Sequence, residues 1–217
     1  MSLKSFATEL IVRKDADLRL RAELIQRAEL IQRGELSEGY HPKMRAVHRA
    51  NTKWLDRRID EFGYPTADRV GEEASAAAWL IVQHAIDHPD FMRRCARLLR
   101  AAVAAGRTKP QPLAYLTDRI AVFEGRPQRY GTQFDWDANG QLSPQPYDDL
   151  DAVNRRRREL GWNDLSDQTR IMRERAAAEQ EHPPVDWTAR QEAMEAWRKQ
   201  VGWTENGDAE SLNFYTR

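Results

Sequence analysis

Apolar residues recur three or four positions apart through most of this chain, and glycine or proline stands where each series stops. The clearest series covers residues 42–62, which open on a proline and are followed by Gly63. Its apolar members are Met44, Val47, Trp54, Leu55, Ile59 and Phe62. Such spacing puts these side chains on one face of an α-helix, and helices of this kind bury that face by packing on one another. The sequence therefore predicts a mainly α fold, a multi-helix bundle-like domain.

Further helices are predicted by the same spacing, over residues 3–35, 71–87, 89–105, 112–124, 149–160, 167–181 and 187–201. Pro89 suits the first turn of a helix, and Gly106 and Gly161 are typical of residues that follow one. The segment 71–87 is apolar nearly all round, which indicates an element at the centre of the fold.

The helical spacing is interrupted after Gly125. Two short segments of extended character, residues 128–136 and 141–147, flank the dipeptide Asn139-Gly140. An Asn-Gly turn between such segments predicts a small β-hairpin, over about residues 128–147. The two prolines in the second segment should keep that strand short and at an edge.

The chain of 217 residues is long enough to bury one core. We expect an N-terminal amphipathic helix in residues 1–39, a core helical domain with the hairpin in residues 40–165, and a C-terminal helical extension with a frayed tail in residues 166–217. The terminal helices would be available for a homo-oligomer or for another protein partner.

Charge and cysteine content exclude several classes of protein. Lys and Arg number 34, and so do Asp and Glu, so the net charge gives no reason to expect nucleic acid or an anionic membrane as a partner. The run Arg155 to Arg158 fans around a helix axis and does not form one basic stripe. A single cysteine, Cys95, fits a reducing compartment, and no apolar run could span a bilayer. We therefore expect a soluble, cytoplasmic protein with no nucleic-acid or membrane partner.

Polar residues interrupt the apolar stretches at several points. Gln83 and His84 follow the run from Trp79 to Val82, and Asp118 and Arg119 follow Leu116 closely. Asn51 falls within the apolar face of residues 42–62. Buried polar groups are costly unless they satisfy one another or a ligand, so their placement predicts a shared polar centre.

A histidine oriented by a carboxylate can act as a general acid or base. We therefore expect His84 and Asp118 to be the catalytic residues of this centre, if it is catalytic. The ligand-binding residues expected around them are Asn51, Gln83, Arg119, Tyr130, Gln133, Arg156 and Arg157. The expected ligand is a small polar or anionic molecule. The alternative is a purely structural network in a protein that acts through its terminal helices.

The histidines give little support for a metal site. His84 and His88 are four residues apart, but Pro89 biases His88 away from helical geometry. His41 and His48 lie on a polar helix face, where we expect them to be solvated. Common nucleophile, phosphate-loop and zinc motifs are not present. The sequence therefore predicts no metal and no cofactor.

Several segments together resemble a bacterial family of domains of unknown function. The resemblance covers about residues 45–165 and rests on Trp-Leu-Ile-Val-Gln-His at 79–84, Asp-Arg at 118–119 and Tyr-Gly-Thr-Gln at 130–133. It implies that these residues belong to one module, and it implies no activity. The chain departs from the pattern at Ile86 and His88, where acidic residues are more usual in the family.

Overall fold

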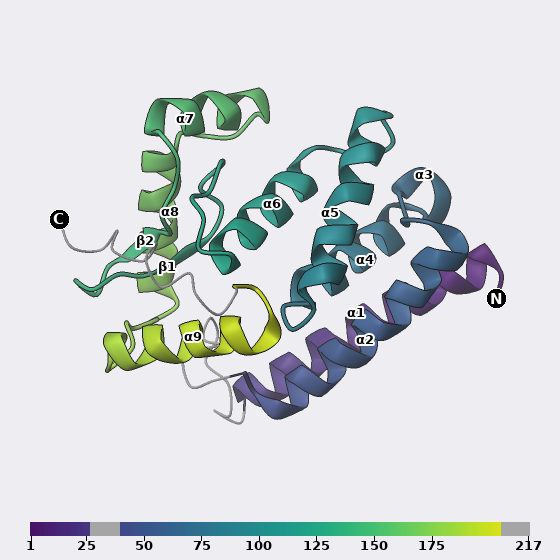
Figure 1. The fold of residues 1–217 in the computed structure, drawn as a ribbon, viewed down its shortest axis with the longest axis horizontal. Coiled ribbons are helices and arrows are strands. Elements are labelled where there is room, and N and C mark those ends of the chain that lie inside the picture. The colour runs from purple at the N-terminus through teal and green to yellow at the C-terminus, as the bar shows by residue number, and fades with distance from the viewer. Residues whose placement is uncertain (27–39, 205–217) are drawn as a thin grey trace. The chain divides into compact units, whose positions relative to one another are not determined.

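A computed structural model of the chain describes residues 1–26 and 40–204. The chain divides into two compact units, Met1–Leu113 and Ala114–Arg217, which are described separately below. The described residues are mainly helical, and their only sheet has two antiparallel strands (Figure 1). The prediction of a mainly α fold with one small hairpin is therefore confirmed.

The first unit is built from helices. They are α1 (Leu3–Gln26), α2 (Pro42–Phe62), α3 (Ala67–Val70), α4 (Glu72–His84) and α5 (Pro89–Ala104), followed by the first residues of α6 (Gln111–Phe123). Helix α2 has the bounds that the sequence predicts, because its proline lies in the first turn and Gly63 follows its last residue with a φ of 71°. Helix α1 lies alongside α2 and also packs on α4 (Figure 1).

Helix α4 is central because its side chains are small. Ala74, Ala77 and Ala78 are buried, and they allow α1 to approach closely. Helix α1 in turn buries Phe6, Leu10 and Leu24. The N-terminal helix is therefore part of the core of this unit. A helix was predicted over residues 3–35. The structure describes it as far as Gln26, and residues 27–35 lie outside the described part of the chain.

The second unit contains the hairpin, the larger part of α6, and the helices α7 (Leu150–Glu159), α8 (Leu165–Ala178) and α9 (Trp187–Val201). Strands β1 (Phe134–Trp136) and β2 (Leu142–Pro144) pair with Asp135 opposite Ser143. They are shorter than the predicted segments. The reason is that backbone N–H groups of residues 129–133 are bound by the side chains of Asp118 and Gln128, which keeps this segment out of the ladder.

Helix α7 begins where the sequence predicts, with Asp149 as its cap. The Asp149 carboxylate accepts a hydrogen bond of 2.8 Å from the backbone N–H of Ala152. Helix α9 matches its predicted range of 187–201. The Trp187 indole N–H donates to the carbonyl of Trp136, and Arg190 pairs with Asp135 at 2.7 Å, so α9 is attached to the hairpin.

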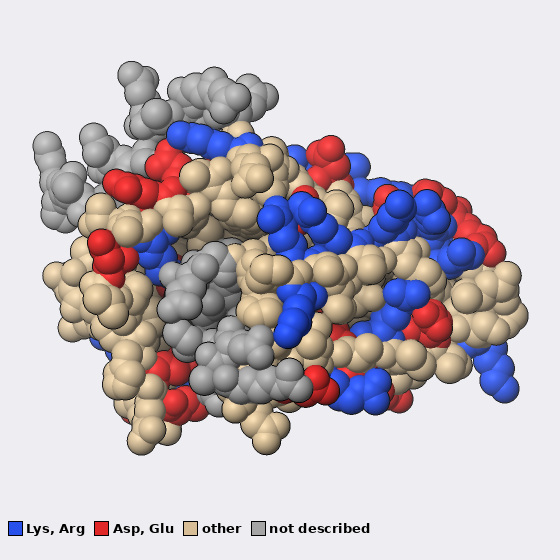
Figure 2. All heavy atoms as spheres, turned by 90° about the horizontal axis from the view of Figure 1, so that it is seen from below, with Lys and Arg blue, Asp and Glu red and all other residues tan. Residues whose placement is uncertain are grey.

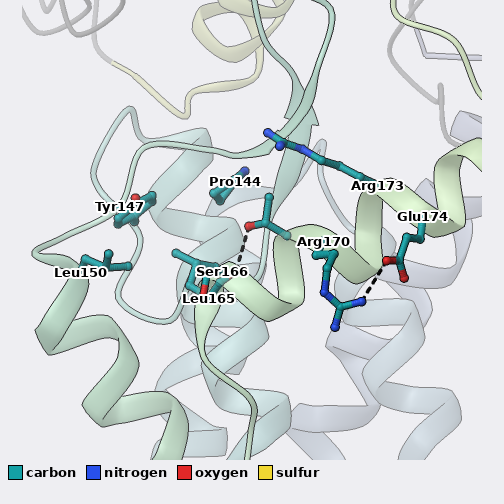
Figure 3. Close-up of a pocket in the computed structure, with 9 residues that line it drawn as sticks. Pro144, Tyr147, Leu150, Leu165, Ser166, Arg170, Arg173 and Glu174 are labelled. Atoms are coloured by element: carbon teal, nitrogen blue, oxygen red, sulfur yellow. Dashed lines mark hydrogen bonds and ion pairs between the residues drawn. The ribbon is translucent and has the colours of Figure 1, made fainter.

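An open groove of about 500 Å³ lies in the second unit, between β2, the start of α7 and α8 (Figure 3). Apolar side chains, among them Tyr147, Leu150 and Leu165, form one side of it. The charged groups of the groove are engaged with neighbours, since Arg170 pairs with Glu174 and Arg173 donates to the carbonyl of Leu142. The groove contains none of the residues expected to bind a ligand.

The surface carries charges of both signs. Lys and Arg side chains are interspersed with Asp and Glu side chains on the face drawn in Figure 2. Among the described residues, no helix combines the length and the apolar character needed to cross a membrane.

Candidate metal centre

In the first unit, an acidic residue lies on the apolar, buried face of α1. Asp17 is midway between Leu10 and Leu24 in α1, seven residues from each, and all three side chains face the core. Asp17 is only 1% exposed. A buried carboxylate is costly unless it is paired, so its surroundings identify the polar centre of this unit.

Two histidines from two other helices meet this carboxylate. His48 of α2 places its Nε2 3.3 Å from Oδ1 and 3.2 Å from Oδ2 of Asp17. His84, the last residue of α4, places its Nδ1 3.0 Å from Oδ2. The centroids of the two imidazole rings are 4.5 Å apart. Three helices therefore converge on one buried carboxylate.

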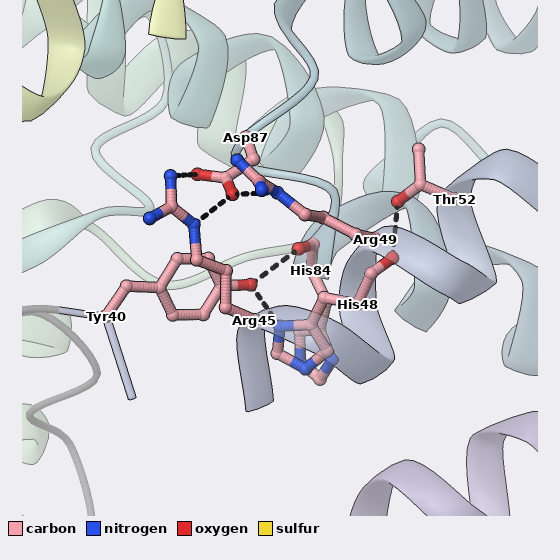
Figure 4. A network of polar contacts seen from close by, with 7 residues as sticks. All are labelled: Tyr40, Arg45, His48, Arg49, Thr52, His84 and Asp87. Carbon is pink, nitrogen blue, oxygen red and sulfur yellow. Dashed lines mark hydrogen bonds and ion pairs between the residues drawn. The ribbon is translucent and has the colours of Figure 1, made fainter. Parts of the chain in front are cut away.

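Tyr40 fixes the far side of His48. Its hydroxyl forms a short hydrogen bond with Nδ1 of His48 and lies 3.4 Å from the carbonyl oxygen of His84 (Figure 4). The hydroxyl of Thr52 donates to the carbonyl of His48 at 2.7 Å. With the Tyr40 hydroxyl donating to Nδ1 of His48, Nε2 carries the proton and donates it to the Asp17 carboxylate.

The Asp17 carboxylate is ionised. Burial alone would raise its pKa, but the hydrogen bonds from His48 and His84 hold the pKa of Asp17 well below its usual value. The centre therefore combines a buried negative charge with two nitrogen donors.

The three side chains have the composition of a mononuclear metal site, and their donor atoms are close together. Each offers one ligand atom, and these atoms all lie within 4.8 Å of one another. Zinc binds nitrogen and carboxylate oxygen at about 2.0–2.1 Å, which places tetrahedral ligands about 3.3–3.4 Å apart. The observed nitrogen to oxygen distances of 3.0–3.3 Å are close to that separation. Three protein ligands also leave a fourth position for water or another molecule.

Positive charge lies beside the centre on α2. Arg45 and Arg49 both bind the buried carboxylate of Asp87, through Nε atoms at 2.6 Å and 2.7 Å (Figure 4). Two guanidinium groups face one carboxylate, so this cluster keeps one net positive charge. The Arg45 guanidinium also lies over the ring of Tyr40, 5.9 Å from its centroid.

Asn51, expected among the ligand-binding residues, is buried in the first unit. Its Oδ1 accepts a hydrogen bond of 3.1 Å from Arg13, whose guanidinium lies 4.4 Å from the ring centroid of Trp54. Gln83 is also buried, next to His84 in α4. Neither residue is among the three candidate ligands of the centre.

The expected partner of His84 has another position and another function. Asp118 is buried in the second unit, where its oxygens accept hydrogen bonds of 2.8–3.2 Å from the backbone N–H groups of Arg129, Tyr130 and Thr132. The Thr132 hydroxyl donates to it as well. The carboxylate that contacts His84 is Asp17, and Asp118 instead holds the segment that precedes β1.

The other expected ligand-binding residues belong to, or contact, the same segment of the second unit. Arg119 donates to Oε1 of Gln133 at 3.0 Å. Arg157 is buried and donates to the carbonyl of Tyr130 at 2.8 Å, while Arg156 donates to the carbonyl of Arg129 and to Asp148. These contacts between side chains and backbone fix the fold of the segment.

The expectation for His48 was wrong, because this histidine is only 3% exposed and belongs to the centre. His88 lies beyond the end of α4 and precedes the first residue of α5, so it does not extend a helical pair with His84.

Sequence reasoning also missed Asp17 and Tyr40. The sequence did carry a signal for Asp17, because it stands seven residues from both Leu10 and Leu24 and so falls on the apolar face of the helix.

The fold and the centre define a mainly helical protein whose N-terminal unit holds a buried Asp-His-His cluster. The chain belongs to the family described as "Family of unknown function (DUF6624)", whose model matches residues 6–179. The match is longer than the 45–165 expected, and it includes all three residues of the cluster. No curated protein and no solved structure matches the chain.

Proposed function

We propose that residues 1–113 form a module that binds a divalent transition-metal ion through Asp17, His48 and His84, and a small polar or anionic molecule through that ion. The observation that carries the proposal is the convergence of three donor atoms, from three helices, within 4.8 Å. A metal ion bound in this way would act as a Lewis acid at its open position.

A bound cation would account for this arrangement. The centre contains an ionised, buried carboxylate, and a metal ion would add a close positive charge to the hydrogen bonds that offset its removal from water. Two imidazole nitrogens and one carboxylate suit the borderline ions such as Zn²⁺ and Co²⁺. Tyr40 would orient the ring of His48 through the hydrogen bond to Nδ1, as partners of metal-binding histidines commonly do.

An anionic ligand is proposed because of the exposure of His84 and the positive charge beside the centre. The His84 side chain is 14% exposed, whereas those of Asp17 and His48 are at most 2% exposed, so a ligand would reach the ion beside His84. The net positive charge of Arg45, Arg49 and Asp87 favours a negative group on that ligand.

A second candidate function is acid–base chemistry without metal. The observation that favours it is the contact of 3.0 Å between Nδ1 of His84 and Asp17, in which the carboxylate orients a partly exposed imidazole. Here Asp17 takes the orienting role that the sequence suggested for Asp118.

The test is metal uptake by chelator-treated, full-length protein. We expect one equivalent of Zn²⁺ to bind in calorimetry, and Co²⁺ to give the visible absorption of a four-coordinate ion. Asp17→Asn, His48→Gln and His84→Gln should each lose at least tenfold in affinity, because loss of even a hydrogen-bonding partner of a metal ligand costs about 10–100-fold.

His182→Gln and Asp118→Asn are the matched controls, because they remove the same chemical groups from the second unit and should leave uptake unchanged. Circular dichroism establishes that each variant is folded. A folded wild-type protein that binds neither ion would refute the metal proposal and leave the acid–base candidate. Equal affinity in folded wild-type, Asp17→Asn and His84→Gln proteins would show that the ion binds elsewhere.

The alternative of an interaction module acting through its terminal helices has less to support it. Helix α1 buries its apolar residues within the first unit, and α9 is held by Trp187 and Arg190. A partner or a second copy of the chain would therefore have to use the outer surfaces of these helices.

A further inference from the structure

A second cavity lies in the first unit and does not include the metal-binding residues. Its volume is about 380 Å³, which is within the range of small-molecule sites. It is lined by α3, α4, α5 and the residues that join α5 to α6. The residues that matter to its chemistry are Tyr64, Glu72, Ala76, Trp79, Arg107 and Lys109.

One face of α4 creates the space. Glu72, Ser75, Ala76 and Trp79 share that face, because 72 and 75, and likewise 76 and 79, are three residues apart, and 72 and 76, and likewise 75 and 79, are four apart. The short side chains of Ser75 and Ala76 leave room that a longer residue would fill. The indole N–H of Trp79 donates to the carbonyl of Pro112 at 3.3 Å, so the ring is held as a flat apolar wall.

A buried tyrosine contributes to the wall of this cavity. Tyr64 is 8% exposed. Its hydroxyl is buried away from solvent, and burial together with the nearby Cys95 raises its pKa. Tyr64 therefore offers the cavity an apolar surface.

The mouth of the cavity carries excess positive charge. Arg107 and Lys109 line it, and neither forms an ion pair with a residue in the described part of the chain. Glu72 is the acidic residue of the lining and opposes them. Two cations and one carboxylate leave a net positive charge, which favours an anionic guest.

From these features we infer that the cavity binds a small aromatic carboxylic acid. The ring would lie against Trp79 and Leu99, and the carboxylate would face Arg107 and Lys109. The inference is independent of the metal proposal, because the two sites share no residue.

Saturation-transfer NMR on the full-length protein tests this site with benzoate, 4-hydroxybenzoate and indole-3-acetate as probes and benzylamine as the cationic comparison. We expect at least one acid to bind saturably at millimolar concentration or below, and benzylamine to bind at least fivefold more weakly. Ala76→Trp should abolish acid binding by filling the cavity, and Ala76 is exposed enough for the larger residue to be accommodated.

The double variant Arg107→Glu/Lys109→Glu should weaken acid binding at least fivefold, while Lys53→Glu, on the exposed side of α2, should not. Failure of all three acids to bind would overturn the inference and leave a cavity that holds water only. Undiminished binding to folded Ala76→Trp protein would also overturn it.

Discussion

A single buried carboxylate organises the polar centre of the first unit. In α1 the stripe of Leu10 and Leu24 would be complete with an apolar residue at position 17, and such a residue would be easier to bury. Burial of the Asp17 carboxylate costs free energy, and hydrogen bonds from its partners offset that cost. Since His48 and His84 come from two other helices, the offset exists only when the three helices are packed together.

Cys95 illustrates the opposite situation, a reactive group made inert by its surroundings. It is fully buried in α5, and burial raises the pKa of its thiol above the ordinary value, with Asp56 adding to the effect. Since the thiolate is the reactive form, we expect native protein to react with a disulfide reagent such as DTNB at least a hundredfold more slowly than denatured protein at pH 8.

The measurement is the rate of thionitrobenzoate release with and without guanidinium chloride. Complete release of one equivalent after denaturation is the internal control. Native protein that reacts as fast as a free thiol would show that Cys95 is accessible, contrary to the packing of α5.

At the scale of elements, local sequence signals predicted most helices well. Helices α2 and α9 have the predicted bounds, and α5 ends one residue early, because prolines, glycines and apolar spacing act within a few residues of each end. The strands were predicted too long. Their limits depend on Asp118 and Gln128, side chains that bind backbone N–H groups of a neighbouring segment, and no local pattern reveals such contacts.

The loop that Asp118 holds depends on a glycine. Gly131 has a φ of 63°, and a Cβ atom there would lie 2.6 Å from Cδ1 of the buried Leu165. Gly131→Ala should therefore combine backbone strain of about 1–2 kcal/mol with overpacking of about 1–3 kcal/mol in the free energy of unfolding. Urea unfolding monitored by tryptophan fluorescence measures the change.

Gly161→Ala is the matched control for this prediction. Gly161 has a similar φ of 72°, but a Cβ atom there would meet nothing within 4 Å. It should lose only the strain of about 1–2 kcal/mol. Equal losses in the two variants would contradict the tight packing of Gly131 against Leu165.

At the scale of the whole molecule, the polar residues noted in the sequence separate into two groups. His84, Gln83 and Asn51 lie in the first unit, and Asp118, Arg119 and Gln133 lie in the second. The burial of Asn51, Gln83 and Asp118 could be predicted, because each interrupts an apolar stretch. Their partners could not, because Asp17, His48 and His84 are separated by 31 and 36 residues and meet only through the packing of three helices.

This division makes the first unit testable alone. All three proposed ligands lie within residues 1–113, and so do Tyr40 and the arginines beside the centre. The core of Phe6, Leu10, Met44, Leu55 and Ile81 is likewise contained in it. We therefore expect a fragment of residues 1–113 to be helical by circular dichroism and to bind one equivalent of Zn²⁺, with an affinity within about threefold of the full-length protein.

The fragment carrying Asp17→Asn is the control, and it should fold but bind at least tenfold more weakly, since it lacks one ligand. Protein that is unfolded as residues 1–113 would show that the second unit is needed for stability. A folded fragment without zinc affinity, beside a full-length protein that binds zinc, would instead require a ligand from residues 114–217. Only retained binding in the fragment agrees with a centre assembled by α1, α2 and α4 alone.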